Sequence, residues 1–219
     1  MLLIVTREYP DPVNNLGNVI KALDARKIPY KITRSRDPRI IRRKDIRGII
    51  IPGTNRARIK PDEIQPELEL ELYYLHHFPS LPVLGLCHGC QFLMVYYGGG
   101  LIKYDTFWNG GAEVELNLAV DNVFHGEDKI QRLLFNFRDL PVVPATTKAG
   151  SHGRGIREIA WVTSFRDHHR HACAFEFVKD RVYGFMFHPE AKKRTWSILY
   201  NFYDRVCLHG DSGATEASL

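Results

Sequence analysis

The chain has 219 residues, of which 44% are hydrophobic and 25% charged, and its formal net charge is +5. This is sufficient for one α/β domain with a large core. No apolar run approaches the length that crosses a membrane, and the N-terminus becomes charged at Arg7, too soon for a signal peptide. Because the four cysteines also fit a reducing compartment, the sequence predicts a cytoplasmic protein.

Short apolar runs alternate with amphipathic stretches in the first half of the chain. Residues 2–5, 49–51 and 83–86 are continuous apolar runs typical of buried parallel strands. Helices are predicted near residues 17–26, near residues 67–78 and from Gln91 to Tyr97. This alternation predicts the fold class α/β, with an open, mostly parallel sheet flanked by helices in a single domain.

The positive charge is concentrated between Arg34 and Lys44, where the sequence reads RSRDPRIIRRK. We interpret this segment as a solvated connection that follows the second strand. The alternative is a docking patch for an acidic partner or for nucleic acid. No aromatic residues are interleaved with the charges, so a nucleic-acid partner is not expected.

A turn with the sequence Gly-x-Cys-x-Gly follows the apolar strand at residues 83–86. Cys87 is its central residue, and Gly85 and Gly89 flank it. Small flanking residues allow a strand and a helix to meet at a strained nucleophile, and the free N–H groups at the start of the helix favour a thiolate. Cys87 is therefore the candidate nucleophile.

The second half of the chain supplies a candidate base. Residues 113–116 alternate like a strand, and residues 172–177 and 181–187 predict a β-hairpin that ends at His188. Pro189 prevents further regular pairing, and Glu190 can turn back to orient the imidazole. The predicted catalytic residues are Cys87, His188 and Glu190.

A closing helix is predicted at residues 195–206. Residues 1–207 are then the domain, and residues 208–219, where the composition turns to Gly, Asp, Ser, Thr and Glu, are predicted to be a disordered tail.

The two motifs, GLCHGCQ with GGG after it and FHPE, resemble those of the class I, or triad, glutamine amidotransferase family. The resemblance covers roughly residues 1 to 205 and implies a flavodoxin-like amidotransferase fold. It also implies hydrolysis of the side-chain amide of glutamine through a γ-glutamyl thioester. An oxyanion hole is then expected from backbone N–H groups of Gly53, Thr54 and His88, and a substrate-binding role is expected for Gln91.

Several positions depart from the family pattern. Thr54 and Cys90 stand where the family commonly has glycine and histidine, and Met186 stands where it has glutamine. In a loose alignment, residues 136–141 replace the family's Tyr-His-Ser segment, which contributes to glutamine recognition. The triad would then be complete while one wall of the substrate pocket has changed.

Three functions stay open on these grounds. The first is a glutaminase-type enzyme that supplies ammonia to a separate synthetase, since the chain is too short to hold a full synthetase domain as well. The second is a stand-alone γ-glutamyl hydrolase or peptidase with the same triad. The third is a non-catalytic binding or regulatory protein.

Cys87 and Cys90 also have the spacing of a redox pair, and His168, His169 and His171 could be recruited with them to a zinc site. No thioredoxin-like pattern surrounds the cysteines, and the histidines lack a convincing ligand spacing. We therefore expect no metal and no cofactor.

Overall fold

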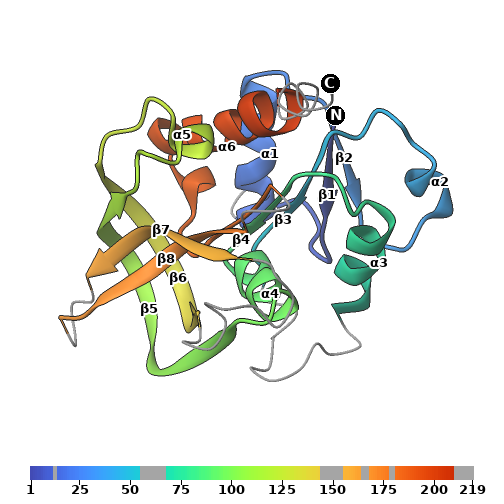
Figure 1. Ribbon diagram of the computed structural model, residues 1–219. Coiled ribbons are helices and arrows are strands. Elements are labelled where there is room, and N and C mark those ends of the chain that lie inside the picture. The colour runs from blue at the N-terminus through green and yellow to red at the C-terminus, as the bar shows by residue number, and fades with distance from the viewer. Residues whose placement is uncertain (12–13, 55–67, 144–154, 164–167, 178–180, 210–219) are drawn as a thin grey trace, which may run out of the picture.

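The computed structural model describes residues 1–11, 14–54, 68–143, 155–163, 168–177 and 181–209 (Figure 1). These residues form one sheet of nine strands in the order β2-β1-β3-β4-β9-β8-β7-β5-β6. The predicted tail at residues 208–219 lies almost entirely outside the described residues.

The first part of the sheet is parallel. Its strands are β2 (Tyr30–Thr33), β1 (Leu2–Val5), β3 (Gly48–Ile51), β4 (Val83–Leu86) and β9 (Val182–Phe185). Every residue of β1, β3, β4 and β9 is buried, which is the pattern of parallel strands covered on both faces. The predicted buried strands at residues 2–5, 49–51 and 83–86 are thus confirmed.

The rest of the sheet is antiparallel. It consists of β8 (Arg170–Phe177), β7 (Ile156–Thr163), β5 (Gly100–Leu116) and β6 (Ile130–Val142). Strands β8 and β9 pair antiparallel, which confirms the predicted hairpin. The length of β5 and β6 was not predicted, because only residues 113–116 alternate clearly in the sequence.

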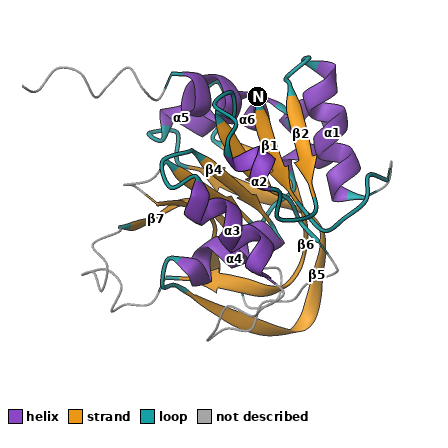
Figure 2. Cartoon of the chain, turned by 90° about the vertical axis from the view of Figure 1, so that its right-hand side faces the viewer, coloured by secondary structure: helices purple, strands orange, loops and turns teal. Residues whose placement is uncertain are grey.

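Helices cover both faces of the sheet. α1 (Asn15–Ala25), α5 (Asp121–Phe124) and α6 (Ser197–Asn201) lie on one side, and α3 (Glu69–His77) and α4 (His88–Tyr96) on the other (Figure 1). The cartoon in Figure 2 shows the sheet between these layers from a second direction. This α/β arrangement, an open sheet flanked by helices, agrees with the predicted fold class.

Two helix boundaries differ from the sequence prediction. Helix α4 begins at His88 rather than at Gln91, because the turn at Cys87 leads into it directly. The predicted closing helix is α6, which continues as a π-helical segment from Phe202 to Leu208. Among the described residues, no helix combines the length and apolar character needed to cross a membrane.

The basic segment forms a connection between β2 and β3 that contains the one-turn helix α2 (Pro38–Ile41). Its basic side chains are exposed, and several form local ion pairs, such as Arg39 with Asp37 and Arg43 with Asp45. These pairs agree with the interpretation of a solvated connection.

Candidate active site

Cys87 lies in the sharp turn between β4 and α4. Its backbone has φ +51° and ψ −104°, a strained conformation for a residue with a side chain. The turn packs closely on both sides. A Cβ added at Gly85 would lie 2.5 Å from the backbone of Gly89, and one added at Gly89 would lie 2.1 Å from the carbonyl oxygen of Ile51. Only glycine therefore fits at either position.

Cys87 is 9% exposed, and its Sγ donates a hydrogen bond to the carbonyl oxygen of Asn136 at 3.4 Å. The other three cysteines are buried and form no disulfide. Burial raises the pKa of Cys90 and Cys173 well above the usual range of a thiol, and it raises the pKa of Cys207 as well. This environment disfavours a thiolate at those three positions.

His188 follows the last strand residues of β9, and Glu190 lies in the short turn after it. His188 Nδ1 and Glu190 Oε1 are 2.8 Å apart, and both side chains are almost completely buried. The backbone N–H of His188 donates to the carbonyl oxygen of Leu134 at 2.8 Å, and Trp196 Nε1 donates to the carbonyl oxygen of Glu190 at 2.9 Å. These backbone contacts hold the pair in a defined orientation.

Electrostatics favour a protonated His188. Burial by itself lowers the pKa of the ring, but the carboxylate of Glu190 and the nearby Cys87 outweigh it and raise the pKa to about 10. Because Nδ1 is held by Glu190 and the buried Nε2 has no hydrogen-bond partner among the described residues, Nε2 is the nitrogen left for proton transfer.

Gly53 lies beside both Cys87 and His188. A Cβ added at Gly53 would be 3.4 Å from Cys87 Cβ and 3.5 Å from His188 Cε1. The loop after β3, the turn after β4 and the end of β9 therefore meet at one edge of the sheet, where the carboxyl ends of parallel strands place their side chains together.

The predicted oxyanion-hole residues Gly53, Thr54 and His88 come from two of these loops. Thr54 Oγ1 donates to Glu8 Oε1 at 2.6 Å, a contact that sequence reasoning did not find. The side chain of His88 is buried, and neither ring nitrogen has a hydrogen-bond partner among the described residues. Burial, with a smaller contribution from Arg7, lowers the pKa of His88 to about 4, so the ring is neutral at physiological pH.

Strand β6 forms a wall beside the triad. Besides the carbonyl groups of Leu134 and Asn136, that of Asp139 takes part, accepting a hydrogen bond from Gln91 Nε2 at 2.6 Å. One amide donor of Gln91 is thus directed to the strand backbone, and its substrate-binding role stays a prediction. The side-chain Oδ1 of Asn136 is buried without a partner in the described part of the chain, whereas Arg138 is exposed.

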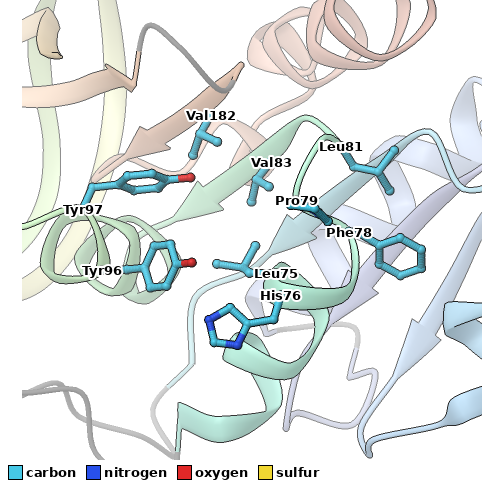
Figure 3. A pocket seen from close by; sticks show the side chains of 9 residues that line it. All are labelled: Leu75, His76, Phe78, Pro79, Leu81, Val83, Tyr96, Tyr97 and Val182. Atoms are coloured by element: carbon cyan, nitrogen blue, oxygen red, sulfur yellow. The ribbon is translucent and has the colours of Figure 1, made fainter. Parts of the chain in front are cut away.

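A pocket of about 310 Å³ lies at the other end of β4 (Figure 3). Val83, the first residue of β4, lines it together with Tyr96 and Tyr97 at the end of α4 and His76 near the end of α3. It contains none of the triad residues. The candidate active site is therefore identified by its side-chain geometry, not by this pocket.

No group of three or more His, Cys, Asp or Glu side chains suitable for a metal ion occurs within the described ranges. Cys90, which has the sequence spacing of a redox or zinc pair with Cys87, packs its sulfur against β9. A Cβ added at Gly184 would lie 2.9 Å from this sulfur.

Comparisons with known proteins agree on one family. A family model described as Glutamine amidotransferase class-I matches residues 13–206. The glutamine-hydrolyzing GMP synthase of Staphylococcus epidermidis is 28% identical over 174 residues, which are 76% of this chain and 29% of that protein. The chain thus spans less than a third of the length of this relative.

Solved structures share the fold. A glutamine amidotransferase from Thermotoga maritima matches with a TM-score of 0.60 and 15% identity, covering 92% of this chain and 81% of that chain. The glutaminase domain of Trypanosoma brucei CTPS, with bound acivicin, matches with a TM-score of 0.64 and 13% identity, covering 92% of both chains.

Proposed function

The chain belongs to the class I glutamine amidotransferase family, and we propose that it hydrolyses the side-chain amide of glutamine with Cys87 as nucleophile, His188 as acid and base, and Glu190 as the orienting carboxylate. The observation that carries this proposal is the buried His188–Glu190 pair, 2.8 Å apart, beside a cysteine in a strained turn. We also propose that residues 1–207 make up the amidotransferase domain.

The reaction would proceed in two steps. The thiolate of Cys87 attacks the amide carbon of glutamine, and His188 gives its Nε2 proton to the departing ammonia, which leaves a γ-glutamyl thioester. Neutral His188 then takes a proton from water, which attacks the thioester and releases glutamate and the free thiolate. Glu190 holds Nδ1 throughout and stabilises the imidazolium.

The negative charge on the carbonyl oxygen in each tetrahedral intermediate needs hydrogen-bond donors. We assign this role to the backbone N–H of His88, the residue after the nucleophile, and to a backbone N–H of the Gly53–Thr54 loop. The position of Gly53 against Cys87 and His188 supports the assignment. The neutral ring of His88 adds no positive charge of its own at this point.

We propose that the ammonia serves a synthetase partner. The curated relatives are named glutamine-hydrolyzing GMP synthases, and this chain corresponds to less than a third of their length. This supports an arrangement in which the acceptor reaction takes place outside the described domain. In the same proposal, free glutamine is a poor substrate for the isolated chain, and a bound partner raises the activity.

The wall formed by β6 favours one other candidate, a γ-glutamyl hydrolase with the same triad. The segment from Asn136 to Pro141 departs from the family pattern, and a looser site for the α-amino and α-carboxylate groups would accept other γ-glutamyl compounds.

One experiment tests both candidates. The purified protein is incubated with glutamine and with a panel of γ-glutamyl compounds, and ammonia and glutamate are measured. The expected result is amide hydrolysis that disappears in Cys87→Ala and in His188→Ala, while Cys90→Ala, the matched control in the same helix, retains it. Strong preference for a γ-glutamyl peptide would favour the hydrolase, and an efficiency for glutamine already near ~10⁴ M⁻¹s⁻¹ would show that no activator is needed. Unchanged turnover in His188→Ala would contradict the mechanism.

A further inference from the structure

The loop that follows β3 has a side-chain attachment to the neighbouring loop. Strands β1 and β3 are parallel neighbours, so the residues that follow directly after them begin at the same end of the sheet. Thr54, in the loop after β3, donates its hydroxyl hydrogen to the carboxylate of Glu8, in the loop after β1, at 2.6 Å. This is a short hydrogen bond to an ionised group, the stronger class of hydrogen bond in proteins.

The Glu8 side of this contact is anchored independently. The backbone N–H of Glu8 donates to Thr6 Oγ1 at 3.0 Å, and Thr6 is buried. The preceding residue, Arg7, forms an ion pair with the buried carboxylate of Glu71 on α3. The following residue, Tyr9, accepts a hydrogen bond at its carbonyl oxygen from Asn14 Nδ2 at 2.8 Å. The carboxylate of Glu8 is therefore presented from a segment that is held on both sides.

The Thr54 side of the contact borders the chemistry. Gly53 is packed so closely that an added Cβ would lie 2.8 Å from Asn15 Nδ2 and within 3.5 Å of atoms of Cys87 and His188. In the proposed oxyanion hole, a displacement of the loop by about 1 Å would take its N–H groups out of hydrogen-bonding range of the carbonyl oxygen. Besides the close packing of Gly53, a contact that holds Thr54 helps to fix the orientation of this backbone.

We propose that Glu8 is a positioning residue, which holds the backbone of Gly53 and Thr54 toward Cys87 through the Thr54 hydroxyl. The inference rests on the proposed function, because it assigns this backbone to the oxyanion hole. In this proposal Glu8 acts on the reaction only through Thr54. Its role is to keep a backbone N–H of Gly53 or Thr54 in place. This donor becomes important when the carbonyl oxygen of the substrate amide acquires negative charge.

The proposal predicts a specific kinetic pattern. Thr54→Val keeps the shape of the side chain and removes the hydroxyl, and it should lower kcat about 10- to 100-fold while KM for the amide substrate changes less than about twofold, since a donor is displaced rather than deleted. Thr54→Ser, which retains the hydroxyl, should recover most of that loss. Glu8→Ala should match Thr54→Val, and Glu8→Gln, which keeps an acceptor oxygen, should lie between Glu8→Ala and the wild type.

Two further measurements separate positioning from a general structural defect. The Glu8→Ala/Thr54→Val double variant should lose no more activity than the more affected single variant, because both remove the same hydrogen bond. Alkylation of Cys87 by iodoacetamide, which forms no oxyanion, should proceed at the wild-type rate in every variant. Thr163→Val on β7 and Glu113→Ala on β5, both exposed and neither among the candidate site residues, are the matched controls. Independent losses that multiply in the double variant, or alkylation that slows in parallel with hydrolysis, would overturn the proposal.

Amide hydrogen exchange, followed by NMR at the N–H groups of Gly53 and Thr54, requires no substrate. Exchange at one or both groups should accelerate at least about tenfold in Thr54→Val and return toward the wild-type rate in Thr54→Ser. Unchanged exchange in Thr54→Val refutes the positioning role even if the enzyme hydrolyses glutamine. A wild-type protein that hydrolyses no γ-glutamyl amide refutes the proposed function instead, whatever the exchange rates are.

Discussion

Replacement of Glu190 by glutamine is the most informative single change at the candidate site. Glu190→Gln preserves the size of the side chain and removes its charge. Glu190 is 1% exposed and lies 2.8 Å from Nδ1 of His188, so bulk water does not screen the pair appreciably. The substitution therefore leaves the imidazole in place with a neutral partner.

The size of the effect follows from the pKa of His188. Burial alone would lower this pKa, but Glu190 and Cys87 raise it from 6.5 to about 10. This difference corresponds to a preference for the protonated ring on the order of 5 kcal/mol. If Glu190 supplies roughly half of it, the imidazolium loses about 2 to 3 kcal/mol, and kcat should fall about 100-fold.

The assay is steady-state hydrolysis of whichever γ-glutamyl amide the wild type accepts, with active sites counted by irreversible labelling of Cys87. Glu158→Gln, an exposed carboxylate change on β7, is the control. Residual activity should remain in Glu190→Gln, because Cys87 and His188 still make and break the bonds. A kcat within about threefold of the wild type would refute the assignment of Glu190 as the orienting group.

The same pair makes stability depend on pH. Because the pKa of His188 is higher in the folded chain than in the unfolded chain, its contribution to the free energy of unfolding is fully present below pH 6.5 and is lost as the pH rises toward 10. In urea unfolding, the free energy of unfolding should fall less between pH 6 and pH 9.5 for Glu190→Gln than for the wild type. Equal losses would show that Glu190 does not raise the pKa.

Three further outcomes are expected. Limited labelling with a glutamine analogue that carries an electrophile at the side-chain carbonyl position should modify mainly Cys87, and peptide mapping that finds another cysteine would contradict its role as nucleophile. His88 titrates at about 4 in the folded chain, below the unfolded value of 6.5, so stability should fall as the pH drops from 6.5 toward 4, by up to about 3 kcal/mol. In urea unfolding, His88→Leu should reduce this fall, and an identical pH dependence would show that His88 is not responsible. Gly89→Ala should cost more than about 3 kcal/mol or prevent folding, because its Cβ would lie 2.1 Å from the carbonyl oxygen of Ile51, whereas Gly155→Ala, whose Cβ would meet no atom of the described residues within 4 Å, should have little effect. Similar thermal unfolding of the two alanine variants would contradict the packing argument.

The sequence by itself indicated the parts of the site that depend on neighbours along the chain. The turn at Cys87 needs glycine at two nearby positions, and the spacing of His188 and Glu190 lets one side chain turn back to the other. Local sterics and short spacing determine both features, so they are visible as motifs. Continuous apolar runs likewise indicated the buried parallel strands.

Tertiary structure alone decided which distant groups surround these motifs. The thiol of Cys87 meets the carbonyl oxygen of Asn136, 49 residues away, and Thr54 meets Glu8, 46 residues away. The neutral state of His88 depends on burial and on a charge at Arg7, and the length of β5 and β6 depends on their pairing with each other. Such contacts follow from how the strands are ordered in the sheet. No local pattern of residues records that order, because the backbone hydrogen bonds that join the strands can be formed by almost any residue type.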